Sequence, residues 1–360
     1  MSTVTERALG SVLRTVKRVV KSSSLLRNLI ADQHSTALFT NLRSHEVMLS
    51  DRTRVNTYRE GLSRQIKPGS VVLDLGTGTG ILSLLAARQN PKKIYAIDHS
   101  DFITVARKIA AENNVTCIEF VQANSRTFTP PDNGKVDTII HEQMGTALFE
   151  ENMINNLLDL KQRLLKPGGS ILPGKFEVFL EPVSLKPDYL VPHISNIAIE
   201  GVDLKFLRNL PEAEKYKGSE YLFGPTDARV AVDRFLCRPE PFLQFDLNSI
   251  NDASEIPTMF MVTRKLETSG SLDAFCLYFK AIFDEQTSFD TSPLSAYTHW
   301  GNKLFRADGR SCEAGTTVSY AVEANPLEDA RKWSILVDAE PAVKGRSAAP
   351  KRQEMASARA

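Results

Sequence analysis

The segment VLDLGTGTG, residues 72–80, constrains the fold more than any other part of this sequence. A run of branched and leucine residues ends near Asp74, three glycines follow at alternate positions, and helical spacing then begins. Glycine lets a backbone bend tightly and approach a ligand closely. In an α/β sheet such a corner lies beyond the carboxyl ends of the strands, where ligands bind. The segment therefore predicts a parallel sheet with a ligand site at this turn.

Strand and helix patterns alternate through the first half of the chain, which predicts a Rossmann-like parallel sheet covered by helices on both faces. A Lys-Pro-Gly-Gly stretch at 166–169 is expected to close the last helix. The expected strands are 70–76, 92–98, 117–123 and 135–142, and the expected helices are 80–89, 101–114 and 150–165.

After residue 173 the pattern changes to strands joined by turn-rich loops, which predicts an antiparallel β-barrel domain. Residues 190–230 are polar, with weak helical spacing, and are interpreted as an insertion. The strands are expected at 176–185, 242–247, 258–266, 273–284 and 316–324. The expected organisation is a helical extension (1–30), an α/β domain (31–173), a β domain (174–340) and a disordered tail (341–360).

The N-terminal segment 5–21 has apolar residues at helical spacing and basic residues largely on the other side. A basic amphipathic helix can touch a membrane surface or an acidic partner, but this one has no Trp or Phe anchor. We therefore favour a helix that packs on its own domain. The segment is also interrupted by charges where a secretory signal would be apolar.

The 360 residues carry a formal net charge of +1, so no global field draws the chain to nucleic acid or to an anionic membrane. No apolar run is long enough to span a bilayer. The four cysteines are scattered without metal-site spacing, which favours reduced thiols, no metal site and a cytoplasmic location.

The glycine turn discriminates between two kinds of nucleotide ligand. The dinucleotide fingerprint requires a third glycine where Ile81 stands. The second strand ends in Asp98, whose carboxylate can accept hydrogen bonds from both ribose hydroxyls. The pattern Gly-x-Gly-x-Gly after an acidic strand residue resembles class I methyltransferases that use S-adenosylmethionine (SAM). SAM, with S-adenosylhomocysteine as its product, is the expected cofactor.

Two acids, Glu142 and Glu151, flank the loop that follows the fourth strand. Two carboxylates near a reacting methyl group would be costly if they stayed unpaired. A guanidinium presents five donors in a rigid fork, so two carboxylates can clamp it. The pair therefore indicates a cationic substrate.

At this point the sequence closely resembles the protein arginine methyltransferases. The likeness is carried by four segments that occur in family order between residues 45 and 335. They are HEVMLSDRTRVNTYREGL (45–62), VVLDLGTGTGILSLLAA (71–87), HEQMGTALFEENM (141–153) and SPLSAYTHWGNKLF (292–305).

The resemblance implies methyl transfer from SAM to a guanidino nitrogen of arginine. It also implies a head-to-tail homodimer with a helical dimerisation arm at 190–230. The implied catalytic residues are Glu142, Glu151, His299 and Asp51. The implied cofactor-binding residues are His45, Arg54 (on the cofactor carboxylate), Asp74, Gly76, Gly78, Asp98 and Ser125, and the implied substrate pocket contains Met48, Met144, Glu150 and Trp300.

The sequence departs from the family at several positions near the substrate. Ser35 and Phe39 replace two tyrosines, Gln143 replaces a tryptophan, and Glu150 replaces an aromatic residue. These changes leave open whether the substrate is free arginine, a small guanidino compound or an arginine in a protein. A methyltransferase for another nucleophile and a non-catalytic SAM-binding scaffold are the alternatives.

Overall fold

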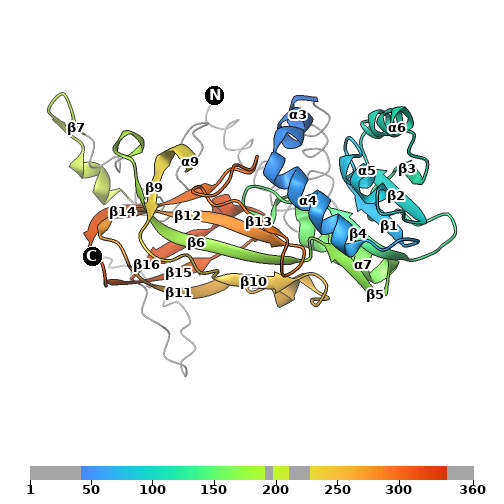
Figure 1. Cartoon of the computed structure of the whole chain (residues 1–360). Helices are drawn as coiled ribbons and strands as arrows, with labels where there is room; N and C mark the ends of the chain where they lie inside the picture. Colours follow the sequence, from blue (N-terminus) through green and yellow to red (C-terminus); the bar gives the residue numbers. More distant parts are fainter. Residues whose placement is uncertain (1–41, 191–197, 211–227, 339–360) are drawn as a thin grey trace, which may run out of the picture.

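The computed structural model describes residues 42–190, 198–210 and 228–338, and every structural statement below refers to these residues. The helix expected at 5–21, the substitutions at 35 and 39, and the tail at 341–360 lie outside them. Figure 1 shows an α/β part beside a larger β part, with two helices between them.

The α/β part is built on a five-stranded parallel sheet with the order β3-β2-β1-β4-β5. The chain runs outward from β1 to β3 and then returns to β4, so β1 and β4 lie at the switch point where ligands bind in such sheets. The strands are β1 (Val71–Leu75), β2 (Lys93–Asp98), β3 (Ile118–Gln122), β4 (Val136–His141) and β5 (Leu165–Leu172).

Three helices connect these strands, α5 (Ile81–Ala87), α6 (Ile103–Glu112) and α7 (Met153–Leu164). The helix expected at 150–165 is shorter, because residues 150–152 form a separate 3-10 turn, η1 (Glu150–Asn152). The stretch 166–169 does not follow a helix into a loop but lies within β5, where the pairing with β4 is irregular. A proline is tolerated there because β5 is the edge strand of the sheet.

The family-like segment 45–62 lies within two helices, α3 (Leu42–Ser50) and α4 (Arg52–Gln65). Asp51 separates them and caps α4, since its carboxylate accepts the Arg54 backbone N–H at 2.9 Å. A side-chain oxygen at this position satisfies one of the N–H groups that a helix start leaves unpaired.

Helix α4 joins the two parts of the molecule. Its fully buried Tyr58 donates a hydrogen bond to the carbonyl of His141 at 2.7 Å, and its ring packs edge-on against Phe283 at 4.9 Å. At Gly61 a Cβ atom would lie 2.4 Å from the Phe283 ring, so only glycine permits this close approach. The two parts therefore form one packed body along α4.

The β part consists of two curled antiparallel sheets that face each other, which confirms the expected fold class. The ring of Tyr320 packs 4.6 Å from that of Phe275 and its hydroxyl donates to the carbonyl of Leu180 across the interior. The first sheet contains β6 (Lys175–Leu185), β9 (Val232–Phe235), β10 (Leu243–Asp246), β12 (Gly270–Ile282), β13 (Ser288–Asp290) and β14 (Lys303–Cys312), and the second contains β11 (Met259–Lys265), β15 (Thr317–Glu323) and β16 (Ser334–Val337).

The described part of the expected helical arm is not α-helical. Residues 198–210 contain a short hairpin, β7 (Ala198–Ile199) with β8 (Val202–Asp203), and a 3-10 helix, η4 (Lys205–Asn209). The chain re-enters the β part through α9 (Ala228–Ala231). Polar residues with weak spacing gave too little signal to distinguish these turns from a helix.

A buried ion pair ties the two β sheets together. Arg264 on β11 donates from Nε and Nη2 to the two carboxylate oxygens of Glu181 on β6, at 2.8 and 2.9 Å. The Glu181 side chain is fully buried and that of Arg264 is 8% exposed. Cys237 and the backbone of Glu240 also donate to this carboxylate, so its charge is well satisfied.

Replacing Arg264 with methionine is expected to lower the free energy of unfolding by about 3–5 kcal/mol, because it leaves a buried carboxylate without its cation. Urea denaturation measures this loss. Arg310→Met is the matched control, because Arg310 pairs with Asp338 at the surface and such pairs contribute about 0–1 kcal/mol. Equal losses in the two variants would contradict the expectation.

Candidate active site

The glycine turn after β1 is supported from below by a buried acid. Asp74 is fully buried and accepts hydrogen bonds from the hydroxyls of Thr77 and Ser83, both at 2.6 Å. Burial raises the pKa of Asp74 to about 6, although the two hydroxyls act in the opposite direction. Asp74 is not among the residues that line the cleft above it. Its place in the structure is to shape the turn.

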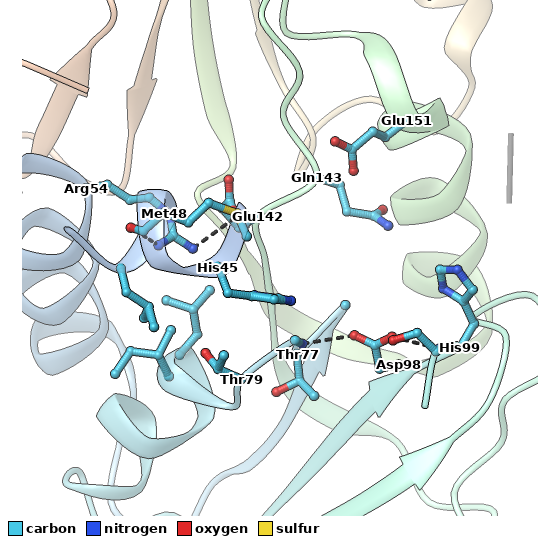
Figure 2. A pocket seen from close by; sticks show the side chains of 16 residues that line it. His45, Met48, Arg54, Thr77, Thr79, Asp98, His99, Glu142, Gln143 and Glu151 are labelled. Carbon is cyan, nitrogen blue, oxygen red and sulfur yellow. Dashed lines mark hydrogen bonds and ion pairs between the residues drawn. The ribbon is translucent and has the colours of Figure 1, made fainter. Parts of the chain in front are cut away.

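The turn itself needs its glycines. Gly76 and Gly78 have φ values of +70° and +52°, a region that favours glycine. At Gly78 a Cβ atom would lie 2.9 Å from the imidazole of His45, whereas nothing lies within 4 Å of one at Gly76. His45 in turn stacks on Phe102 with ring centroids 4.0 Å apart. Space for a ligand is thus open at Gly76, whereas the His45 ring, which Figure 2 shows over the turn, covers Gly78.

Asp98, at the end of β2, lines the same cleft. One oxygen accepts the Gly78 N–H at 2.9 Å, and the other accepts the backbone and hydroxyl of Ser100 at 2.9 and 2.7 Å. A carboxylate can accept about four hydrogen bonds, so capacity for a ribose hydroxyl is left. Asp98 thus has a free acceptor position close to Gly78.

Arg54 lies at the opposite end of the cleft. It donates from Nη2 to Glu142 at 2.9 Å and from Nη1 to the Met48 carbonyl at 3.0 Å. Its Nε is buried and has no hydrogen-bond partner among the described residues. An unsatisfied buried donor of this kind costs about 1–3 kcal/mol, which a ligand carboxylate would offset.

The cleft therefore fits SAM. It has a ribose acceptor at one place, an unsatisfied guanidinium N–H at another, and glycine backbone between them. Its empty space, counting the part open to solvent, is about 780 Å³. In addition to the residues named above, the lining includes Leu49, Thr77, Thr79, Ile81, Leu82, His99, Gln143 and Glu151.

Glu142 is held between a cation and a histidine. Its Oε2 accepts from Arg54, and its Oε1 lies 3.9 Å from Nε2 of His299. The other ring nitrogen of His299 contacts Asp51 at 2.9 Å, and the His299 backbone N–H donates to the same Asp51 oxygen at 2.7 Å. Burial opposes ionisation of Asp51, but the hydrogen bonds from His299 and Arg54 outweigh it and lower its pKa.

Glu151 reaches the cleft from η1, where its backbone has a φ of +68°. No described residue donates a hydrogen bond to its carboxyl group or forms an ion pair with it. Burial, and then the charges of Glu142 and Glu150, raise its pKa to about 8. Figure 2 shows the side chain beside Gln143, facing the same cleft as Glu142.

Several expected site residues lie outside the lining of the cleft. Glu150 turns back onto its own loop and accepts the Ala147 N–H at 2.8 Å. Trp300 is buried, and its indole N–H donates to the backbone carbonyl of Met144 at 2.6 Å. Met144 is buried too, so the side chains of Trp300 and Met144 support the loop between Glu142 and Glu151 and do not line the cleft. Ser125 accepts a hydrogen bond from Arg163 through its carbonyl, at 2.7 Å. Met48, by contrast, lines the cleft.

The lining includes residues that the sequence patterns did not single out, among them Thr77, Thr79 and His99. Thr77 and Thr79 alternate with the glycines, and His99 follows Asp98 directly. All three directly follow the carboxyl ends of β1 and β2, where ligands bind in such sheets, so the sequence alone could have predicted them as cleft residues.

Comparison with known proteins identifies both parts of the chain. A methyltransferase domain model matches residues 72–169, and a model of the arginine methyltransferase oligomerization subdomain matches residues 192–338. Protein arginine N-methyltransferase 6 of Danio rerio is 30% identical over 310 residues, which cover 83% of this chain and 87% of the relative. The chain belongs to the protein arginine N-methyltransferase family. The enzyme is a SAM-dependent arginine N-methyltransferase.

Other relatives agree. Protein arginine N-methyltransferase 1 of Caenorhabditis elegans is 29% identical over 78% of this chain and 80% of its own length. The Trypanosoma brucei PRMT1 enzyme-prozyme heterotetrameric complex with AdoHcy has the same fold, with a TM-score of 0.70 and 24% identity over 84% of this chain and 95% of that chain. The crystal structure of PRMT6-SAH has a TM-score of 0.62 at 21% identity, over 83% of this chain and 99% of that one.

No helix in the described ranges is long and apolar enough to cross a membrane. Within the same ranges, no group of three or more His, Cys, Asp or Glu side chains is arranged to hold a metal ion.

Replacing Gly78 with alanine is expected to raise the dissociation constant for SAM at least tenfold (about 1.4 kcal/mol), because the new methyl group would displace His45. Isothermal titration calorimetry measures the constant. Gly69→Ala is the matched control, since Gly69 has a φ of +77° but open space around it. An equal loss of SAM affinity in both variants would assign the effect to backbone strain alone.

Proposed function

We propose that this enzyme methylates the guanidino group of arginine between Glu142 and Glu151, in the cleft that also takes the adenosine of SAM. The observation that carries the proposal is the half-buried carboxyl group of Glu151, which lines the cleft with Glu142 and has no side-chain partner among the described residues. Leaving such a group unpaired costs free energy. A planar cation that contacts both acids removes this cost.

Clamping also activates the substrate. A guanidinium is a poor nucleophile because its lone pairs are delocalised and its pKa exceeds about 12. Carboxylates on two of its nitrogens localise positive charge there and leave the third nitrogen richer in electron density. When bound, SAM supplies a methyl group that is already activated on a sulfonium. The remaining task of the protein is to place the nitrogen and the charges correctly.

The new N–C bond requires one N–H proton to leave the guanidinium. Glu142 is the acceptor in our proposal, and His299 takes the proton onward through Nε2. Asp51 holds Nδ1 of His299 and would stabilise the ring when it becomes charged. The separation of 3.9 Å between His299 and Glu142 is too long for a hydrogen bond, but such contacts often tighten in a substrate complex.

We propose arginine in a protein as the substrate, because the curated relatives that cover most of this chain are named for protein arginine methylation. Free L-arginine is the second candidate. The polar side chain of Gln143 on the cleft wall favours it, since a free amino acid needs polar partners for its own carboxylate and amine.

The assembly and location are part of the same proposal. We propose a homodimer, because residues 192–338 match an oligomerization subdomain. We also assign methyl transfer to residues 31–173, which contain the α/β part. We assign contacts with the substrate and the partner subunit to residues 174–340, which contain the β part. The four cysteines are all free, which favours the reducing cytoplasm.

Labelling with radioactive methyl-SAM tests the substrate and the glutamate together. We expect label in an arginine-glycine-rich peptide, and Glu142→Gln should lower this turnover by at least about 10²-fold, the scale for losing one acid–base or electrostatic group. Glu112→Gln is the matched control, since Glu112 is exposed at the end of α6 and lies outside the cleft lining. Label in free arginine alone would move the assignment to the second candidate. Near-normal turnover by Glu142→Gln would contradict the proposed role of Glu142 in clamping the guanidinium and accepting its proton.

Arginine binding is expected to depend on the ionisation of Glu151. With a pKa of about 8, its carboxyl group is mostly protonated at pH 7, whereas clamping a guanidinium requires the carboxylate. Substrate affinity in the presence of S-adenosylhomocysteine should therefore rise about tenfold per pH unit from pH 6 and level off above pH 8. Calorimetry in buffers of different ionisation enthalpy should show nearly one proton released at pH 7. Glu151→Gln should bind weakly at every pH, and an unchanged pH dependence in this variant would refute the assignment.

A further inference from the structure

Three consecutive residues around His299 are tied to three different elements. His299 binds Asp51 at the start of α4, through both its backbone and its ring. Trp300 donates to the carbonyl of Met144, in the loop that carries the two glutamates. Thr298 accepts a hydrogen bond from Arg229 on α9, at the returning end of the 190–230 segment. The loop that carries His299 is thus held at three points, and only the Arg229 contact has no part in the function described so far.

Arg229 holds more than one residue of this loop. Its Nη2 donates to the hydroxyl of Thr298 at 2.9 Å, and its Nη1 donates to the carbonyl of Ala296 at 3.5 Å. Its guanidinium carbon also lies 5.0 Å from the ring centroid of Tyr297. Thr298 is 1% exposed whereas Tyr297 is 57% exposed, so the arginine covers the loop at the point where it turns inward to His299.

We infer that Arg229 is a positioning residue for His299. Nε2 of His299 stands 3.9 Å from Glu142, so a movement of about 1 Å separates the observed arrangement from a hydrogen bond. A loop free to shift by a similar distance would lose that alignment, and misplacement on this scale can lower a rate about 10²-fold. The inference rests on the proposed role of His299 in proton removal.

The choice of arginine fits this task. A guanidinium presents several N–H donors in one rigid plane, so it can hold a hydroxyl, a carbonyl and an aromatic ring together. A lysine at the same place carries the charge but cannot hold the two oxygens in a fixed geometry. Because α9 ends the 190–230 segment, Arg229 also links that segment to the active site.

The test is a double-mutant cycle between Arg229 and His299, read as kcat and KM with the full-length enzyme. Arg229→Met is expected to lower kcat at least about tenfold and to leave the KM for SAM within about twofold. Thr298→Val, which removes the accepting hydroxyl and keeps the side-chain shape, should have a similar effect. In the His299→Ala background, neither substitution should lower kcat further. Arg229→Lys should retain part of the activity.

Arg234→Met is the matched control, because Arg234 follows on β9, is half exposed and pairs with its neighbour Asp233. It should leave kcat unchanged. Equal fractional losses of kcat from Arg229→Met with and without His299 would show a general structural effect and overturn the inference, as would normal kcat in both Arg229→Met and Thr298→Val. Normal turnover by His299→Ala would instead overturn the proposed proton path, which separates the two failures.

Discussion

The carboxylate of Asp51 accepts three hydrogen bonds that connect the two parts of this enzyme. One oxygen caps α4 through the Arg54 N–H, and the other holds the backbone and ring of His299, which belongs to the β part. The same helix start carries Arg54, whose guanidinium holds Glu142. The start of α4, the position of Arg54 in the cleft and the position of His299 thus all depend on the fully buried Asp51. In return, the N–H groups of Arg54 and His299 satisfy the hydrogen-bonding capacity of the Asp51 carboxylate.

The cleft concentrates acids where burial makes charge expensive. Glu142 is compensated by Arg54, and Asp51 by its donors, but Glu151 is not compensated and its pKa is raised accordingly. In the proposed function, Glu151 gains its only counter-ion from the incoming cation, whereas Glu142 already has one in Arg54. A neutral nucleophile would leave Glu151 unpaired, which is the physical argument for a guanidinium. Groups with strongly shifted pKa values are common at functional sites, because such sites hold charges that only a bound ligand compensates.

Much of the architecture could be predicted from local signals. The strand–glycine–helix unit, the acid at the end of β2 and the alternating patterns gave the parallel sheet to within a few residues. Two long strands, β5 and β14, were missed because a Pro-Gly-Gly stretch and an Asp-Gly-Arg stretch interrupt their patterns. The other missed strands, β7, β8, β9, β13 and β16, have two to four residues each, too few for a pattern to show. Glu151 was expected at the cleft, and it lines it. The position of Glu150 outside the lining was not predictable, because it depends on a hydrogen bond within the loop.

The link between Asp51 and His299 spans 248 positions of the chain. On the ribosome, Asp51 and the whole parallel sheet emerge long before the loop that carries the histidine has been made. A nascent chain that has already folded its sheet therefore still lacks one half of the Asp51–His299 pair. The Asp51–His299 pair can form only after synthesis has passed residue 299, so a product truncated between the sheet and that residue contains the sheet without the pair.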